Sequence, residues 1–118
     1  MADDAKMTLD VPGLRKLVRT DSQVESRFAK LLQEWRSQTA FESVGSRVVF
    51  HPAFRAIVAL GPQAIPLILK EMTRFQHVAW LSALADLTGE DPVKEGHRRN
   101  ARLMTEDWIA WGKSNGLV

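Results

Sequence analysis

The sequence predicts an all-α protein, a compact bundle of five to six helices. Apolar residues recur three and four positions apart through most of the 118 residues, which places them on one face of a helix. Glycine and proline interrupt this pattern at short intervals, as they do where helices end and begin. No alternation of apolar and polar residues indicates a sheet. A chain of this length folds as one domain and buries about two-thirds of its unfolded surface.

The N-terminal part is predicted to contain a tail and two helices. Residues 1–10 have no apolar period and are expected to be a flexible tail, so that a single helical domain covers residues 11–118. A short helix is expected over 11–20 and a longer one over 22–38, because each segment has an apolar stripe. The stripe of the longer helix consists of Val24, Phe28, Leu31, Leu32 and Trp35.

The middle of the chain is predicted to form a connection and two further helices. Serine and glycine break the helical period over 39–51, which we interpret as the connection. A helix over 52–60 follows, opened by a proline and closed by Gly61, and the next helix covers 62–74. His51 directly precedes the first of these helices and is expected to cap it or to form a hydrogen bond.

The C-terminal part is predicted to contain two helices separated by a loop. Apolar residues at helical spacing indicate a helix over 76–88, and Gly89 terminates it. Residues 89–97 have the composition of turns and are expected to form a loop. The last helix is predicted to begin near Arg98 and to end before Gly116.

Two motifs resemble the paired helices of a HEAT-type hairpin. They are Leu60-Gly61-x-x-Ala64-Ile65-Pro66-Leu67 in the first helix, and Val78 with Ala83-Leu84-x-x-Leu87 in the second. The resemblance covers about residues 58–89 and implies one HEAT-like hairpin within a compact bundle. It does not imply a solenoid, because stacked repeats need about three copies for stability.

A wider pattern is similar to a small bacterial all-α protein family. It consists of His51-Pro52-Ala53-Phe54, Leu60-Gly61, Leu87-Thr88-Gly89-Glu90-Asp91-Pro92-Val93 and Trp108-x-x-Trp111-Gly112. This resemblance implies a bacterial or phage setting and no particular activity.

The sequence offers no recognisable catalytic or metal-binding pattern. Cysteine is absent, which excludes disulfide scaffolds, thiolate zinc sites and cysteine catalysis. The three histidines lack metal-ligand spacing, and neither a P-loop nor a nucleophile elbow is present. We therefore expect no enzyme, no cofactor and no metal. A metal-dependent hydrolase that uses the acidic loop from Glu90 to His97 is the enzymatic alternative.

The positive charge of the chain concentrates in residues 94–102. This segment has a net charge of +3, whereas the remaining residues together carry −1. Its basic residues are Lys94, Arg98, Arg99 and Arg102. At the start of a helix, the helix dipole disfavours a cation by about 0.3–1 kcal/mol, so an anionic partner is expected there. That partner is a carboxylate of the same domain, an acidic protein surface or nucleic-acid phosphate. A second basic group, at residues 15–19, would favour the phosphate if it lay nearby.

Four tryptophans are a high number for a chain of this size. Three of them are expected in the core, because each ring buries about 150–250 Å². Trp111, near the C-terminus, is predicted to be partly exposed. Together with Phe41 or Phe75, it is a candidate for the aromatic anchor of an interface.

These observations favour a non-enzymatic helical protein-binding module. We expect a small adaptor, inhibitor or regulatory subunit, of a bacterial mobile-element, immunity or toxin-control complex. The expected partner is a protein with an acidic surface, bound by Lys94, Arg98, Arg99, Arg102 and Trp111. The alternative is an accessory protein that binds the phosphate backbone of nucleic acids. The polar, acidic N-terminus and the short apolar stretches predict a cytoplasmic protein with no membrane partner.

Overall fold

The computed structural model describes residues 22–75 and 77–118, and this part of the chain is all-α. Its α-helices are α2 (Ser22–Thr39), α3 (Gly45–Val49), α4 (Pro52–Ala59), α5 (Ile65–Arg74), α6 (Val78–Thr88) and α7 (Ala101–Ser114). Two short 3₁₀-helices, η2 (Gly61–Ala64) and η3 (Glu95–His97), precede α5 and α7. The predicted bundle of five to six helices is confirmed. The predicted tail over 1–10, the helix over 11–20 and the basic group within that helix lie outside the described residues.

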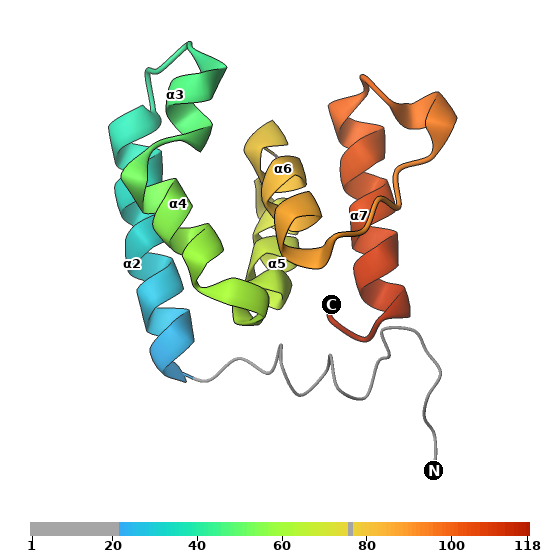
Figure 1. The fold of residues 1–118 in the computed structure, drawn as a ribbon, viewed down its shortest axis with the longest axis horizontal. Helices are drawn as coiled ribbons and strands as arrows, with labels where there is room; N and C mark the ends of the chain where they lie inside the picture. Colours follow the sequence, from blue (N-terminus) through green and yellow to red (C-terminus); the bar gives the residue numbers. More distant parts are fainter. Residues whose placement is uncertain (1–21, 76) are drawn as a thin grey trace.

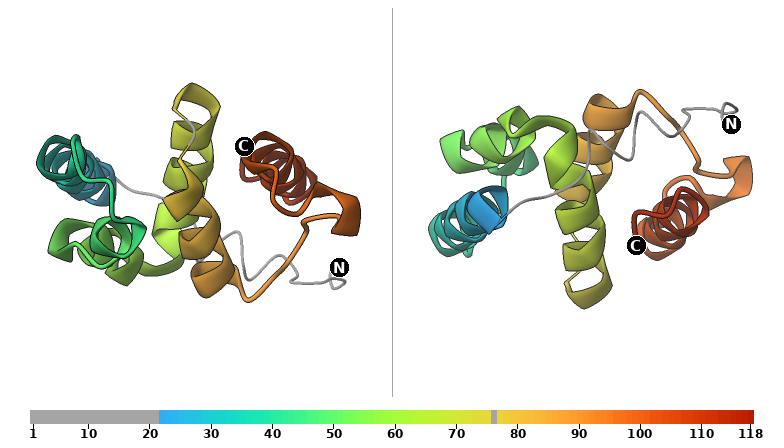
Figure 2. Two further views of the ribbon diagram at one scale, coloured as in Figure 1. Left: turned by 90° about the horizontal axis from the view of Figure 1, so that it is seen from above. Right: turned by 90° about the horizontal axis from the view of Figure 1, so that it is seen from below.

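The helices are arranged in three layers (Figures 1 and 2). α2 packs along α4, and α3 packs against α4 near the C-terminal end of α2. α5 and α6 form the middle layer, and α7 packs against both of them from the other side. α2 and α7 therefore lie on opposite sides of the molecule.

Aromatic rings form the centre of the core. The ring centroid of Trp35 lies 5.0 Å from that of Phe54 and 5.0 Å from that of Trp80, which joins α2, α4 and α6. Trp35, Trp80 and Trp108 are each at most 2% exposed. Trp111 is only partly buried, against the edge of Trp108 at 5.4 Å. The expected burial of three tryptophans and the partial exposure of the fourth are both confirmed.

The connection predicted over 39–51 contains a helix that the sequence pattern did not indicate. α3 forms there because its buried Val48 is fixed to α2 by a tertiary hydrogen bond. The indole Nε1–H of Trp35 donates to the carbonyl oxygen of Val48 at 2.9 Å. A single packed turn of this kind gains its stability from the core, because five residues are too few to form a helix alone.

The helix predicted over 62–74 is divided at its start. η2 comes first, and the α-helical hydrogen bonds begin with α5, whose first turn contains Pro66. Proline has no N–H, so it is best accommodated where a helix starts. Gly61 and Gly89 adopt left-handed backbone with φ of 81° and 70°, as their positions after α4 and α6 predicted.

Polar side chains cap three of the helices. The Nδ1 of His51 accepts the N–H of Ala53 at 3.0 Å, which confirms its expected role at the start of α4. Asn100 caps α7 by accepting the N–H of Leu103 at 3.0 Å. The last helix thus begins after Asn100 and not at Arg98, because the asparagine side chain satisfies an N–H of the first turn.

Candidate functional site

A groove separates α2 from the turn that joins α5 to α6. Its volume is about 670 Å³, within the range of about 300–1,000 Å³ that ligand sites occupy. It is lined by Ala29, Leu32, Gln33, Trp35, Arg36, Ser37, Thr39, Ala40, Glu42, Val48, Phe75 and His77. Most of these residues belong to α2, and two belong to the α5–α6 turn. Helix α2 therefore forms one wall of the groove and the turn forms the other.

The groove exists because α2 buries only one of its faces. Its buried Phe28 and Trp35 turn towards the other helices of the domain, with α4 as its main neighbour. Ala29 and Ala40 are exposed on the side that faces the groove, and Leu32 is only partly buried. Small and apolar residues on an uncovered helix face leave room for another chain.

Three exposed apolar side chains lie in the groove or in the segment that follows α2. Phe75 is 43% exposed where α5 ends, and it lines the groove. Phe41 is fully exposed and Val44 is 42% exposed in the segment between α2 and α3. Of these three residues, only Phe75 lines the groove, and it adds exposed apolar surface there. Phe41 and Phe75 were both candidates for an exposed anchor, and both are exposed.

Two interactions join Arg36 of α2 to residues of α5 and of the α5–α6 turn. Its Nη1 donates to Oε2 of Glu71 at 3.1 Å, and its guanidinium carbon lies 4.2 Å from the centroid of the Phe75 ring. The Glu71 side chain is only 7% exposed, whereas that of Arg36 is 44% exposed. The buried carboxylate thus fixes the arginine, and part of the guanidinium still faces water.

His77 contributes an uncharged ring to the groove. Its Nδ1 accepts the N–H of Ala79 at 3.1 Å and thereby caps α6. Its ring lies 5.2 Å from that of Trp35. Burial lowers the pKa of His77 below its ordinary value, because a charged imidazole loses hydration there. At neutral pH the groove therefore gains no positive charge from this residue.

The remaining carboxylate in the lining is bound within its own loop. An oxygen of Glu42 accepts the N–H of Val44 at 3.0 Å and lies 3.8 Å from Nη1 of Arg47. Ser37 and Thr39 are also engaged locally, because each hydroxyl donates to a carbonyl of α2. The hydroxyls of the groove are therefore not arranged as a nucleophile activated by His77.

The predicted basic edge (Lys94, Arg98, Arg99 and Arg102) lies elsewhere, on the loop before α7 and on the first turn of that helix (Figure 1). Arg98 Nη2 donates to Oδ2 of Asp91 at 2.8 Å, and Arg102 Nη1 donates to Oε2 of Glu106 at 2.8 Å. Residues 91–107 contain four basic and four acidic side chains, so their charges cancel. Two members of the basic edge are therefore partnered by carboxylates of the same chain, although they remain exposed.

The other two members of the basic edge, Lys94 and Arg99, are exposed, and Arg99 has an unusual backbone conformation. Lys94 and Arg99 have no ion pair within the described residues. Arg99 adopts a left-handed backbone with φ of 75°, which is uncommon for a residue other than glycine. Arg98 and Arg99 precede the Asn100 cap, so only Arg102 lies within the helix. The expectation that all three arginines open the last helix is wrong.

A buried carboxylate fastens this loop to α7. Oδ2 of Asp107 accepts the backbone N–H of Lys94 at 3.0 Å and lies 2.8 Å from Nδ1 of His97. The N–H of Lys94 is the main cause that lowers the pKa of Asp107, and His97 adds to it. The guanidinium of Arg98 likewise lowers the pKa of Asp91. The acidic and histidine side chains of the loop thus hold its shape.

Trp111 does not lie with the groove. It belongs to α7, where its ring packs on Trp108, whereas the groove is formed by α2 and the α5–α6 turn. The structure therefore places Trp111 and the basic edge on the α7 side, and it brings Phe75 together with Arg36 in the groove. Phe41 is exposed directly after α2 and does not line the groove. The sequence pattern had indicated the two phenylalanines but not where the groove lies.

No known protein family, curated protein or solved structure matches this chain. Among the described helices, none alone has both the length and the apolarity to cross a membrane. Only α4 combined with η2 and α5 reaches that length, and these segments are bent by 108° relative to each other.

Proposed function

We propose that this chain is a non-enzymatic, cytoplasmic helical protein-binding module that holds a segment of a partner protein in the groove. The observation that carries this proposal is the combination of an apolar lining with the exposed ring of Phe75 and the fixed cation of Arg36. Protein interfaces favour aromatic residues and arginine at their centres. The groove offers this combination in one place.

The groove supports the proposal better than the basic edge does. Arg98 and Arg102 already have carboxylate partners, and the charges around them cancel. A phosphate-backbone binder gains its affinity from several unpaired cations in one patch. The basic edge offers only Lys94 and Arg99 for that purpose. A protein partner is therefore the function that we propose, and nucleic acid is an outcome of the test.

The HEAT-like hairpin and the bacterial setting belong to the same proposal. The hairpin corresponds to the segment from the end of α4 to the end of α6, and its middle turn forms one wall of the groove. Stacked helical hairpins commonly bind other proteins on one face, although such an analogy concerns the fold and not the activity. A small adaptor, inhibitor or regulatory subunit would need no more than such a face.

The test is affinity capture from the organism that encodes the chain, followed by mass spectrometry. The groove variant is Ala29→Trp, because Ala29 is exposed and its enlargement fills the groove without disturbing the core. Ala110→Trp is the matched control on the exposed face of α7. Lys94→Glu combined with Arg99→Glu tests the basic edge.

A protein recovered with the native chain and with Ala110→Trp, but not with Ala29→Trp, supports the proposal. Recovery that survives Ala29→Trp and disappears with the variant of the basic edge contradicts it. Nuclease treatment that releases all captured proteins would indicate nucleic acid as the true ligand. Circular dichroism of each variant confirms that the fold is retained.

A further inference from the structure

We infer that the occupant of the groove is an amphipathic helix of a partner protein, apolar on one face and acidic along its flank. This inference rests on the proposed function and identifies the chemistry of the partner. It is carried by the charges beside the groove and by the length of α2 that forms one of its walls.

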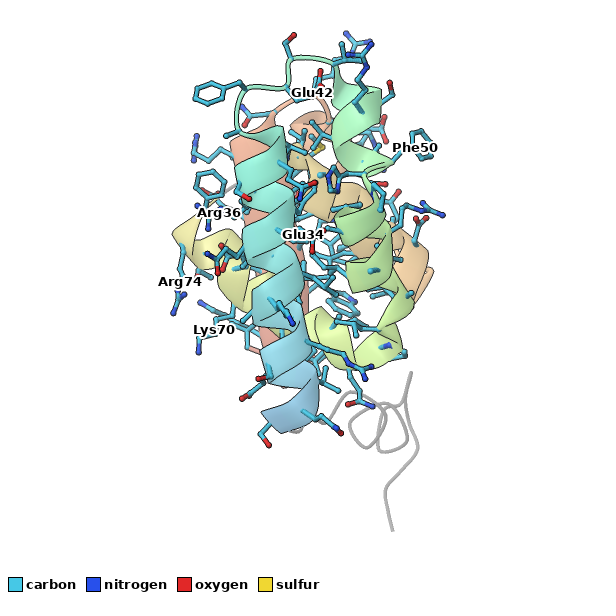
Figure 3. All side chains as sticks on the ribbon, turned by 90° about the vertical axis from the view of Figure 1, so that its left-hand side faces the viewer. Glu34, Arg36, Glu42, Phe50, Lys70 and Arg74 are labelled. Carbon is cyan, nitrogen blue, oxygen red and sulfur yellow. The ribbon has the colours of Figure 1, made fainter. Side chains whose placement is uncertain are left out.

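The rim of the groove next to α5 consists of Arg36, which lines the groove, with Lys70 and Arg74 on α5, and it has an excess of positive charge. Lys70 and Arg74 are exposed one turn apart on α5 and have no ion pair within residues 22–75 and 77–118. In Figure 3, Arg74 and then Lys70 follow below Arg36, all on the same side of α2. The carboxylate of Glu71 neutralises one of these three cations. An occupant with acidic side chains is therefore electrostatically complementary to this rim.

Arg36 is prepared to bind a carboxylate. Its guanidinium has five N–H donors, of which one hydrogen-bonds to Glu71. Glu71 and Phe75 already fix its orientation, so little side-chain freedom is lost when a partner binds. A planar guanidinium with free donors can bind a carboxylate through two parallel hydrogen bonds. Glutamate or aspartate of the occupant is the matching group.

The walls of the groove suit a helix. The residues of α2 that line it extend from Ala29 to Thr39, which corresponds to about 16 Å of helix or three turns. A partner helix of that length presents apolar residues at positions i, i+3 or i+4, and i+7 to such a groove. The described residues include no strand to which an extended peptide could add. Helix-in-groove binding is therefore the mode that the fold supports.

The experiment uses the full chain and a display library of 14-residue amphipathic helices. The apolar face of each helix is varied among aliphatic and aromatic residues, and the flank is varied among Glu, Gln and Lys. We expect selection to enrich Glu over Lys on the flank. The Kd of a selected, fluorescein-labelled peptide is then measured by fluorescence anisotropy.

The variant for the rim is Lys70→Glu combined with Arg74→Glu, with Lys70→Gln combined with Arg74→Gln as the milder form. The charge reversal is expected to weaken binding of the acidic peptide by about tenfold or more, and binding should also weaken as salt increases. The same peptide with Lys in place of Glu should bind the reversed variant better than it binds the native chain. Lys94→Glu combined with Arg99→Glu is the control and should leave the Kd unchanged.

Each other outcome overturns the inference in a distinguishable way. Peptides that are blocked by Ala29→Trp but carry no acidic flank would overturn the acidic helix and leave the proposed function intact. Peptides that bind Ala29→Trp as well as the native chain, or the recovery of no peptide, would overturn both. Tighter groove binding by a single-stranded oligonucleotide, or by a synthetic peptide of residues 1–21, would identify a different occupant.

Discussion

Removing either partner of the ion pair between Arg36 and Glu71 should destabilise the fold, but the two losses should be unequal. Arg36→Met keeps the aliphatic stem and removes the guanidinium, which leaves the Glu71 carboxylate 7% exposed and without its partner. Exposed pairs contribute about 0–1 kcal/mol, and breaking a fully buried pair costs about 3–5 kcal/mol. Because only one partner is buried here, we expect a loss of about 2–3 kcal/mol, including the contact with Phe75.

Replacing the other partner, Glu71, should lower the stability much less. In Glu71→Met the guanidinium of Arg36 remains 44% exposed and keeps its hydration, so the expected loss is below about 1 kcal/mol. The double variant should resemble Glu71→Met, because it contains no unpaired charge. The assay is urea denaturation followed by circular dichroism at 222 nm, since urea does not screen charge. Equal losses in the two single variants, or additive losses in the double variant, would refute the reasoning.

Three further predictions concern local contacts. A Cβ added at Gly112 would lie 2.7 Å from Leu69 Cδ1, whereas Gly45 has open space around it. Gly112→Ala should therefore be less stable than Gly45→Ala by about 1–3 kcal/mol in urea denaturation. Equal stabilities of the two variants would contradict this prediction. Burial lowers the pKa of His77, so native stability should decline as the pH falls below about 6.5. His77→Asn should keep the cap and lose that slope in thermal melts between pH 8 and pH 5, and an unchanged slope would show that other groups cause it. Because the pKa of Asp107 is lowered in the fold, its carboxylate stabilises the fold at neutral pH, and this stabilisation is lost as the pH falls below about 4. Asp107→Asn should accordingly lower the melting temperature at pH 7 but not at pH 2.5, and a pH-independent difference would rule out the charge as the cause.

Helix periodicity predicted most of the fold because the apolar stripes coincide with the buried faces. α2, α4 and α6 follow their stripes to within two residues, and Gly61 and Gly89 mark the ends of two of these helices. The pattern failed where a tertiary contact decides the structure. α3 has a weak local signal, and the hydrogen bond from Trp35 that holds it joins residues 13 positions apart.

The candidate site was less predictable, since it depends on which helix faces remain uncovered. Charge counting led to the segment over 94–102, but the carboxylates that neutralise it lie just outside that window, at Asp91 and Glu106. The exposure of Phe41 and Phe75 was one of the alternatives that the sequence left open. The contact of Phe75 with Arg36 required the packing of α5 beside α2, which no local pattern encodes.

The lengths of the helices explain why a groove remains. α2 has 18 residues and α4 has 8, so the two helices are about 27 Å and 12 Å long. α4 therefore covers less than half the length of α2, and α5 approaches α2 through the contacts of Arg36 with Glu71 and Phe75. A face that served only solubility would carry charged residues throughout. Ala29 on α2 and Phe75 on the opposite wall instead leave space and apolar surface, which fits the proposed binding groove.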